Sequence, residues 1–154
     1  MDALVLKSRL PDSILPYPAG AWNRIKWVFW RAISPGYLFG MHTLLKLRLI
    51  HHEGRQNFVL GKIAEGRTLD DFLAYLYTQG FANHFIAWKD DDQIVSLRRL
   101  ESFEWQYHLR IFKDGEVRGH YEYTPECHPR LHSKEIGFEE RRGDFLNFLG
   151  DWIN

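Results

Sequence analysis

The stretch EWQYHLRIFKDGEVRGHYEYT, residues 104–124, places histidine, arginine, glutamine and glutamate side chains among apolar residues. These residue types can do chemistry when they converge. Histidine transfers protons near neutral pH, arginine binds phosphate or carboxylate through a planar fork, and glutamate serves as an acid or a base. Whether they converge depends on the register of the strands that carry them.

The register of this hairpin follows from the requirement that each face of a sheet stays either apolar or polar. A two-residue turn at Asp114 and Gly115 pairs Leu109 with His120, which mixes the faces. A three-residue turn with Gly115 in the left-handed conformation pairs Leu109 with Gly119 and keeps them uniform. One face then carries Trp105, Tyr107, Leu109, Ile111, Val117, Tyr121 and Tyr123. The other carries three polar pairs: Gln106 with Glu122, His108 with His120, and Arg110 with Arg118.

The preceding hairpin extends the polar face. With residues 90–92 as its turn, strand 83–89 pairs with strand 93–100, and His84 lies beside Arg98. A connection through residues 101–103 then places Ser96 beside His108. The sequence therefore predicts one face that carries nine candidate ligand-binding residues: His84, Trp88, Arg98, Gln106, His108, Arg110, Arg118, His120 and Glu122.

An anionic ligand is the first hypothesis for this face. Arg98, Arg110 and Arg118 would hold a phosphate or a nucleic-acid backbone, two histidines would complete the pocket, and Trp88 would stack on a base or ring. Arginines directly opposite each other repel mildly unless an anion lies between them. The competing interpretation is an ordinary solvated sheet face that long arginine stems cover.

Two other functions stay open at the level of sequence. A metal-assisted or acid-base hydrolase would use His108, His120 and Glu122. His120, Cys127, His128 and His132 are possible metal ligands, but their spacing matches no compact zinc signature, so no metal site is predicted there. No cofactor is identified, and the sequence does not decide whether the chain is an enzyme.

The N-terminal third is basic and aromatic. Residues 1–20 contain LPDSILPYPAG, which favours an extended arm. Residues 21–33 have helical spacing and the sequence SPG follows, so a short basic aromatic helix is predicted, with a candidate protein partner at residues 22–31. Between Ser13 and His52 the chain has five basic residues and no acidic one, which suits an anionic partner such as nucleic acid or a lipid headgroup.

Residues 43–154 are predicted to form an α+β body. Strands at 43–50 and 56–63 would make an N-terminal hairpin ahead of the meander of about four strands. A helix begins at Thr68, whose capping partner is Asp71, and ends at Gly80; a second helix lies at the C-terminus. The fold class is an antiparallel β-sheet with helices packed on one face.

Composition bounds the remaining choices. A chain of 154 residues with formal net charge +0 is expected to be a single domain, 1–154. One cysteine and the lack of a long apolar centre near the N-terminus favour the cytoplasm. No apolar run approaches the roughly 20 residues of a transmembrane segment. The sequence carries no phosphate-binding glycine loop, glycine-flanked nucleophilic serine or dinucleotide fingerprint.

Overall fold

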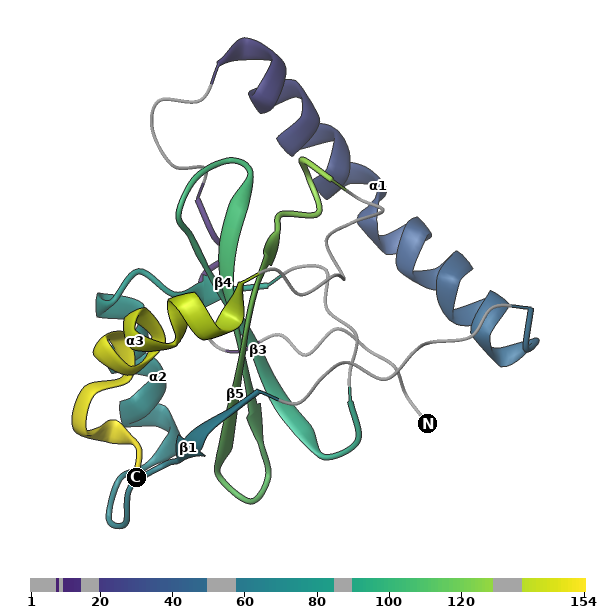
Figure 1. Ribbon diagram of the computed structural model, residues 1–154. Helices are drawn as coiled ribbons and strands as arrows, with labels where there is room; N and C mark the ends of the chain where they lie inside the picture. Colours follow the sequence, from purple (N-terminus) through teal and green to yellow (C-terminus); the bar gives the residue numbers. More distant parts are fainter. Residues whose placement is uncertain (1–7, 9, 15–19, 50–57, 85–89, 129–136) are drawn as a thin grey trace.

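A computed structural model describes residues 8, 10–14, 20–49, 58–84, 90–128 and 137–154 of the chain (Figure 1). Within these residues an antiparallel sheet has the strand order β1-β5-β4-β3-β2. Its strands are β1 Val59–Lys62, β2 Ala82–Asn83, β3 Gln93–Leu100, β4 Trp105–Phe112 and β5 Glu116–Tyr123. The helices are α1 Ala21–Lys46, α2 Leu69–Thr78 and α3 Phe138–Leu149, and a short 3₁₀ turn, η1 Gly150–Trp152, follows α3. The predicted α+β fold is confirmed.

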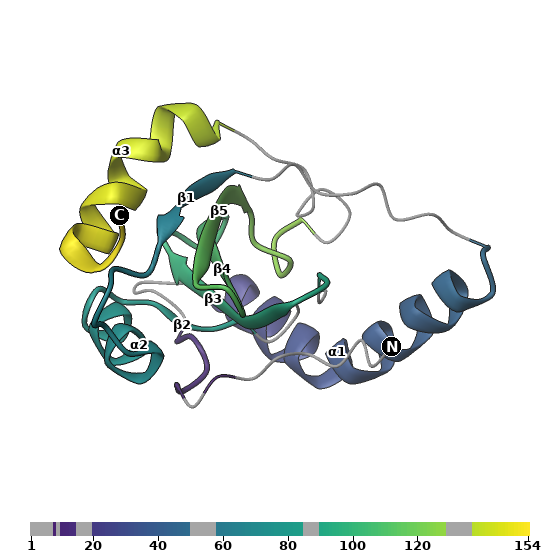
Figure 2. The same cartoon turned by 90° about the horizontal axis from the view of Figure 1, so that it is seen from below.

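The helices lie on both sides of the sheet. Figure 2 shows α2 and α3 on one side and α1 on the other. Apolar residues of α2, α3 and one face of the sheet form the core. Its fully buried members are Phe72, Leu76, Phe81, Leu97, Leu109, Ile111, Val117, Phe145 and Leu149. The prediction of helices packed on one face is confirmed for α2 and α3, and α1 adds a third layer over the polar face.

The β4–β5 hairpin has the predicted register. Leu109 lies opposite Gly119 and His108 opposite His120. Gly115 has φ 83°, the left-handed conformation that the three-residue turn requires. The sorting of apolar and polar residues was therefore sufficient to derive this pairing.

The β2–β3 and β3–β4 pairings are each shifted by two residues from the predicted register. Arg98 lies opposite Ala82 and His108, not opposite His84 and Gln106, and Ser96 lies opposite Arg110. The β3–β4 connection is longer than predicted because the Ser102 hydroxyl accepts hydrogen bonds from the backbone N–H groups that follow it. A shift of two residues keeps every side chain on its predicted face. Most of the predicted strand 83–89 lies outside the described residues.

Helix α1 is twice as long as predicted, because the SPG sequence does not end it. Pro35 lies inside the helix and cannot donate to the carbonyl of Arg31. The hydroxyl of Ser34 donates to that carbonyl instead, at 3.2 Å. The helix therefore continues through Pro35 to Lys46.

The predicted strand 43–50 is wrong, since its first four residues are the last turn of α1. After Lys46 the chain turns, and Arg48 has φ 58°. The return strand does exist as β1, but it pairs with β5, where Val59 lies opposite Arg118. The N-terminal hairpin and the boundary at residue 43 are corrected accordingly. The alternation of leucine with basic residues predicted a strand, but leucine also strongly favours helices.

The arm and the start of α2 are as predicted where they are described. Asp12 forms an isolated parallel bridge with Asn83, so this part of the arm runs along the β2 edge. The Asn83 side chain donates to the carbonyl of Leu10 at 2.7 Å. The hydroxyl of Thr68 accepts from the backbone N–H of Asp71 at 3.1 Å, which confirms the helix cap. Among the described residues, none of the helices has the length and apolar character that crossing a membrane requires.

Gly119 lies where helix α3 packs most closely on the sheet. A Cβ atom at this position would lie 2.9 Å from Leu60 Cδ1, 3.1 Å from Phe145 Cε1 and 3.2 Å from Phe138 Cε2. These neighbours belong to the core and have little room to move. The absence of a side chain at Gly119 therefore sets the distance between α3 and the sheet.

We expect Gly119→Ala to lower the free energy of unfolding by about 1–3 kcal/mol, because it overpacks the core. Gly143→Ala is the matched control: a Cβ there would meet nothing within 4 Å, and alanine favours the interior of α3. The control should raise the free energy of unfolding by up to about 1 kcal/mol. Urea denaturation measures both, and equal effects of the two substitutions would contradict the packing described.

Candidate functional site

The polar face of the sheet is buried apart from Arg118, whose side chain is 22% exposed. Eight of its side chains come from β3, β4, β5 and the residue that follows β2, and none of these is more than 3% exposed. They are His84, Ser96, Arg98, Gln106, His108, Arg110, His120 and Glu122. Helix α1, the N-terminal arm and the turn after β5 contribute contacts to this face. The expectation of a solvated face is therefore wrong, and we call these eight residues the buried polar network.

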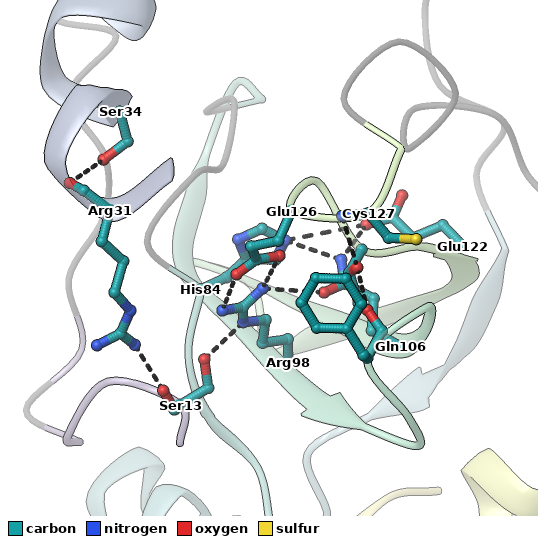
Figure 3. A network of polar contacts seen from close by, with 11 residues as sticks. Ser13, Arg31, Ser34, His84, Arg98, Gln106, Glu122, Glu126 and Cys127 are labelled. Atoms are coloured by element: carbon teal, nitrogen blue, oxygen red, sulfur yellow. Dashed lines mark hydrogen bonds and ion pairs between the residues drawn. The ribbon is translucent and has the colours of Figure 1, made fainter. Parts of the chain in front are cut away.

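Arg98 lies at the centre of this network (Figure 3). Its guanidinium donates to both carboxylate oxygens of Glu126, at 3.0 and 2.7 Å, and neither side chain is exposed. Its Nε donates to the hydroxyl of Ser13 at 2.6 Å, and its Cζ lies 5.0 Å from the centre of the Trp27 ring. One arginine thus joins the sheet to the arm, to α1 and to the turn that carries Glu126.

The other two predicted arginines also face carboxylates of the chain. Arg110 forms an ion pair with Asp90, and Arg118 forms one with Glu116. With Glu126 against Arg98, each arginine of the predicted anion site has an internal partner. An external phosphate or nucleic acid at this face stays a prediction, and it would compete with these three carboxylates. Trp88, the predicted stacking residue, lies outside the described residues.

Three potential metal ligands converge inside the network. His84 Nε2, His108 Nδ1 and Glu122 Oε1 all lie within 4.8 Å of one another. Nε2 of His84 is 4.0 Å from the Glu122 oxygen, and Nδ1 of His108 is 3.0 Å from it. Ligands about 2.1 Å from a tetrahedral metal ion are separated by about 3.4 Å, so these distances bracket the spacing that an ion needs.

Gln106 and Ser96 orient these ligands. Nε2 of Gln106 donates to Glu122 Oε1 at 2.9 Å and lies 3.0 Å from His84 Nε2. Because an amide nitrogen only donates, Nε2 of His84 accepts this hydrogen bond through its lone pair, and a metal ion bound at that atom would replace the Gln106 contact. The second ring nitrogen of His108, Nε2, lies 2.8 Å from the Ser96 hydroxyl. Such outer hydrogen bonds are what hold metal-binding histidines in position.

The hydrolase set predicted from sequence is only partly assembled. His108 and Glu122 are in contact, whereas His120 interacts with Arg110 and lies edge-on to Phe58. The ring centres of His108 and His120 are 5.9 Å apart. His84 takes the place beside Glu122 that the sequence analysis gave to His120.

Cys127 and His128 form a separate cluster with Glu104 near the surface. His128 Nε2 lies 3.2 Å from Glu104 Oε1. Burial, followed by the charge of Glu104, raises the pKa of the Cys127 thiol, which leaves less of the nucleophilic thiolate at neutral pH. His132 lies outside the described residues, and His120 lies elsewhere, in the network.

The sequence did not predict several residues that belong to the buried polar network or contact it. Ser96 was placed on the polar face but given no role, and Ser13, Trp27, Asp90 and Glu126 were not connected with it. The last four come from the arm, a helix, a turn and a loop, so no strand pattern indicates them. One signal was present in the sequence: if a sheet face that carries three arginines is buried, carboxylates must lie near them.

Comparison of the chain with family models, with curated proteins and with solved structures finds no match. The function must therefore be inferred from the geometry of the buried polar network.

We expect Glu126→Gln to lower the free energy of unfolding by about 3–5 kcal/mol, because it leaves the charge of Arg98 buried without its carboxylate. Asp114→Asn is the matched control, since it removes an equivalent partner from Lys62 in an exposed pair of 2.7 Å. That change should have little effect. Denaturant unfolding compares the two, and similar losses would show that the Arg98–Glu126 pair does not organise the fold.

Proposed function

We propose that the protein binds one divalent transition-metal ion at a buried site formed by His84, His108 and Glu122. The observation that carries the proposal is the convergence of the three ligand atoms within 4.8 Å, all from buried residues. Two imidazoles and one carboxylate are a donor set that suits zinc and ferrous iron. This is the metal-dependent alternative of the sequence analysis with His84 in place of His120.

Electrostatics supports a cation at this point. Burying the Glu122 carboxylate is costly unless a positive charge lies beside it. Arg98 and Arg110 are directed at other carboxylates, those of Glu126 and Asp90. Glu122 Oε1 accepts from the amide of Gln106 and lies beside the two imidazoles, which can bind either a proton or a metal ion.

The number of protein ligands also bears on the role of the ion. Three protein ligands leave at least one coordination position for water or a substrate, as in catalytic zinc sites. A metal in such a position lowers the pKa of bound water and activates it for hydrolysis.

The test is metal content and affinity. Protein freed of metal with a chelator and then dialysed against Zn²⁺, or anaerobically against Fe²⁺, should retain about one ion per chain. His84→Ala should lose this stoichiometric binding because it removes a ligand. Ser96→Ala should keep the stoichiometry with affinity lowered about 10–100-fold, since Ser96 only orients His108.

His128→Ala is the control, because His128 belongs to the surface cluster. It should bind metal as the unaltered chain does. Circular dichroism and thermal unfolding of the metal-free variants establish that each is folded. Equal metal binding by the folded His84→Ala variant and the unaltered chain would refute the proposed site.

A second candidate function rests on a different set of contacts. Ser96 Oγ lies 2.8 Å from His108 Nε2, and His108 Nδ1 lies 3.0 Å from Glu122 Oε1. This is the order of contacts in a Ser-His-carboxylate triad, where the imidazole takes the hydroxyl proton and the carboxylate orients the ring. We propose acyl-group hydrolysis as the alternative, with Ser96 as nucleophile and His108 as general base.

The two functions require opposite states of His108. As a base toward Ser96, the ring accepts at Nε2 and carries its proton on Nδ1, the nitrogen that lies 3.0 Å from Glu122 Oε1. As a metal ligand, it binds through Nδ1 and donates from Nε2 to Ser96. A bound metal ion therefore excludes the nucleophilic state of Ser96, and the same protein cannot use both at once.

A fluorophosphonate probe distinguishes them, because it reacts covalently with activated serines. If the triad operates, the metal-free protein should be labelled at Ser96, labelling should vanish in Ser96→Ala and His108→Ala, and added Zn²⁺ should suppress it. Mass spectrometry of the labelled peptide identifies the site. Absence of labelling in the folded metal-free protein would eliminate the hydrolase alternative and leave the metal site unaffected.

A further inference from the structure

Helix α1 exposes an apolar face that points away from the protein. Trp22 and Val28 are each 66% exposed and Phe39 is 76% exposed. Ile25 and Phe29 lie between them in the sequence and are more than half exposed. Trp22, Ile25, Val28 and Phe29 are three or four residues apart, and at about 100° per residue Phe39 falls on the same side of the helix. We call these five residues the α1 apolar face.

The opposite side of α1 holds the helix on the protein. Trp27 and Ser34 are buried, and Trp27 lies over the Arg98 guanidinium. Arg31 donates to the backbone carbonyl of Ser13 at 2.5 Å. Since these residues already attach α1 to the sheet, the α1 apolar face is not needed to pack the helix against the protein. Large solvent-exposed apolar surfaces of this kind mark interaction sites.

The lysine, arginine, aspartate and glutamate residues of α1 and the turn after it are all of one sign. Residues 14–52 contain no aspartate or glutamate, whereas α1 and the turn after it carry Arg24, Lys26, Arg31, Lys46 and Arg48. Arg24, Lys46 and Arg48 are exposed, and they flank the α1 apolar face at both ends of the helix. A 26-residue helix is about 39 Å long, so the charges are distributed along an extended line. The complementary partner is an extended anionic surface that also accepts apolar side chains.

An anionic lipid surface meets both requirements. A second copy of α1 would bring basic residues against basic residues, with no acid on either helix to pair with them. A nucleic acid would engage the cations but would leave the valine, isoleucine and phenylalanine side chains in water. Helices with one apolar aromatic face and flanking lysine and arginine lie in the plane of the membrane interface.

We infer that the α1 apolar face docks the protein on an anionic membrane surface, with α1 parallel to the bilayer plane. Trp22, Phe29 and Phe39 insert among the acyl chains near the headgroups, and Arg24, Lys46 and Arg48 contact lipid phosphates. This surface is independent of the proposed metal site, which lies beneath the other side of the helix.

The test is co-sedimentation of the full chain with vesicles of phosphatidylglycerol and phosphatidylcholine in equal parts. Binding is expected to these vesicles and to be much weaker to phosphatidylcholine alone or at high salt, which screens the attraction. The double variant Val28→Glu and Phe29→Glu should bind at least about tenfold more weakly, because it places charge in the apolar face. Both side chains are exposed, so the fold should persist, as circular dichroism can show.

The matched control is the double variant Tyr77→Glu and Leu146→Glu. It adds the same charge at exposed apolar positions of α2 and α3 and should bind nearly as the unaltered chain does. Equal losses in both double variants would mean that net charge alone governs binding, and would overturn the inference. So would unchanged binding by the α1 variant. A dimer in solution that the α1 variant dissociates, without vesicle binding, would assign the face to a second copy instead.

Discussion

The buried ion pair between Arg98 and Glu126 is the interaction on which the arrangement around the polar face depends. A sheet whose second face is polar would normally leave that face in water. Here Arg98 contacts a carboxylate from the turn after β5, a hydroxyl from the arm and the ring of Trp27 from α1. Three separate segments of the chain are thereby held over one face, and the other polar side chains of the sheet become buried with it.

Burial changes what these side chains can do. In water, arginines and histidines on a sheet would attract any passing anion, and their charges would be screened. When these side chains are buried, each charge needs a specific partner. Glu126 is the partner of Arg98, and Asp90 is the partner of Arg110. Glu122 faces imidazoles instead, which bind either a proton or a metal. Arg98 and Arg110 are therefore paired inside the protein, and an external anion would compete with Glu126 and Asp90.

Sequence patterns could predict which face each strand residue occupies, but not what lies above that face. Leu109, Gly119 and their neighbours sort unambiguously, and register errors of two residues at β2–β3 and β3–β4 preserved the sorting. Helix α1 was predicted too short because Ser34 offsets the effect of Pro35 at the Arg31 carbonyl, a local contact that periodicity does not encode. The acids that pair with Arg98 and Arg110 come from the turns after β5 and before β3, where no periodic pattern exists.

The position of α1 connects the two surfaces of functional interest. Its inner side contacts the network through Trp27 and, by way of the Ser13 backbone, through Arg31. Ser13 accepts from Arg31 at its carbonyl and from Arg98 at its hydroxyl, so the helix and the sheet share one residue of the arm. A force that lifts α1 would separate Trp27 from Arg98 and expose the Arg98–Glu126 pair to water. Whatever binds the outer side of α1 therefore acts on the helix whose inner side contacts Arg98.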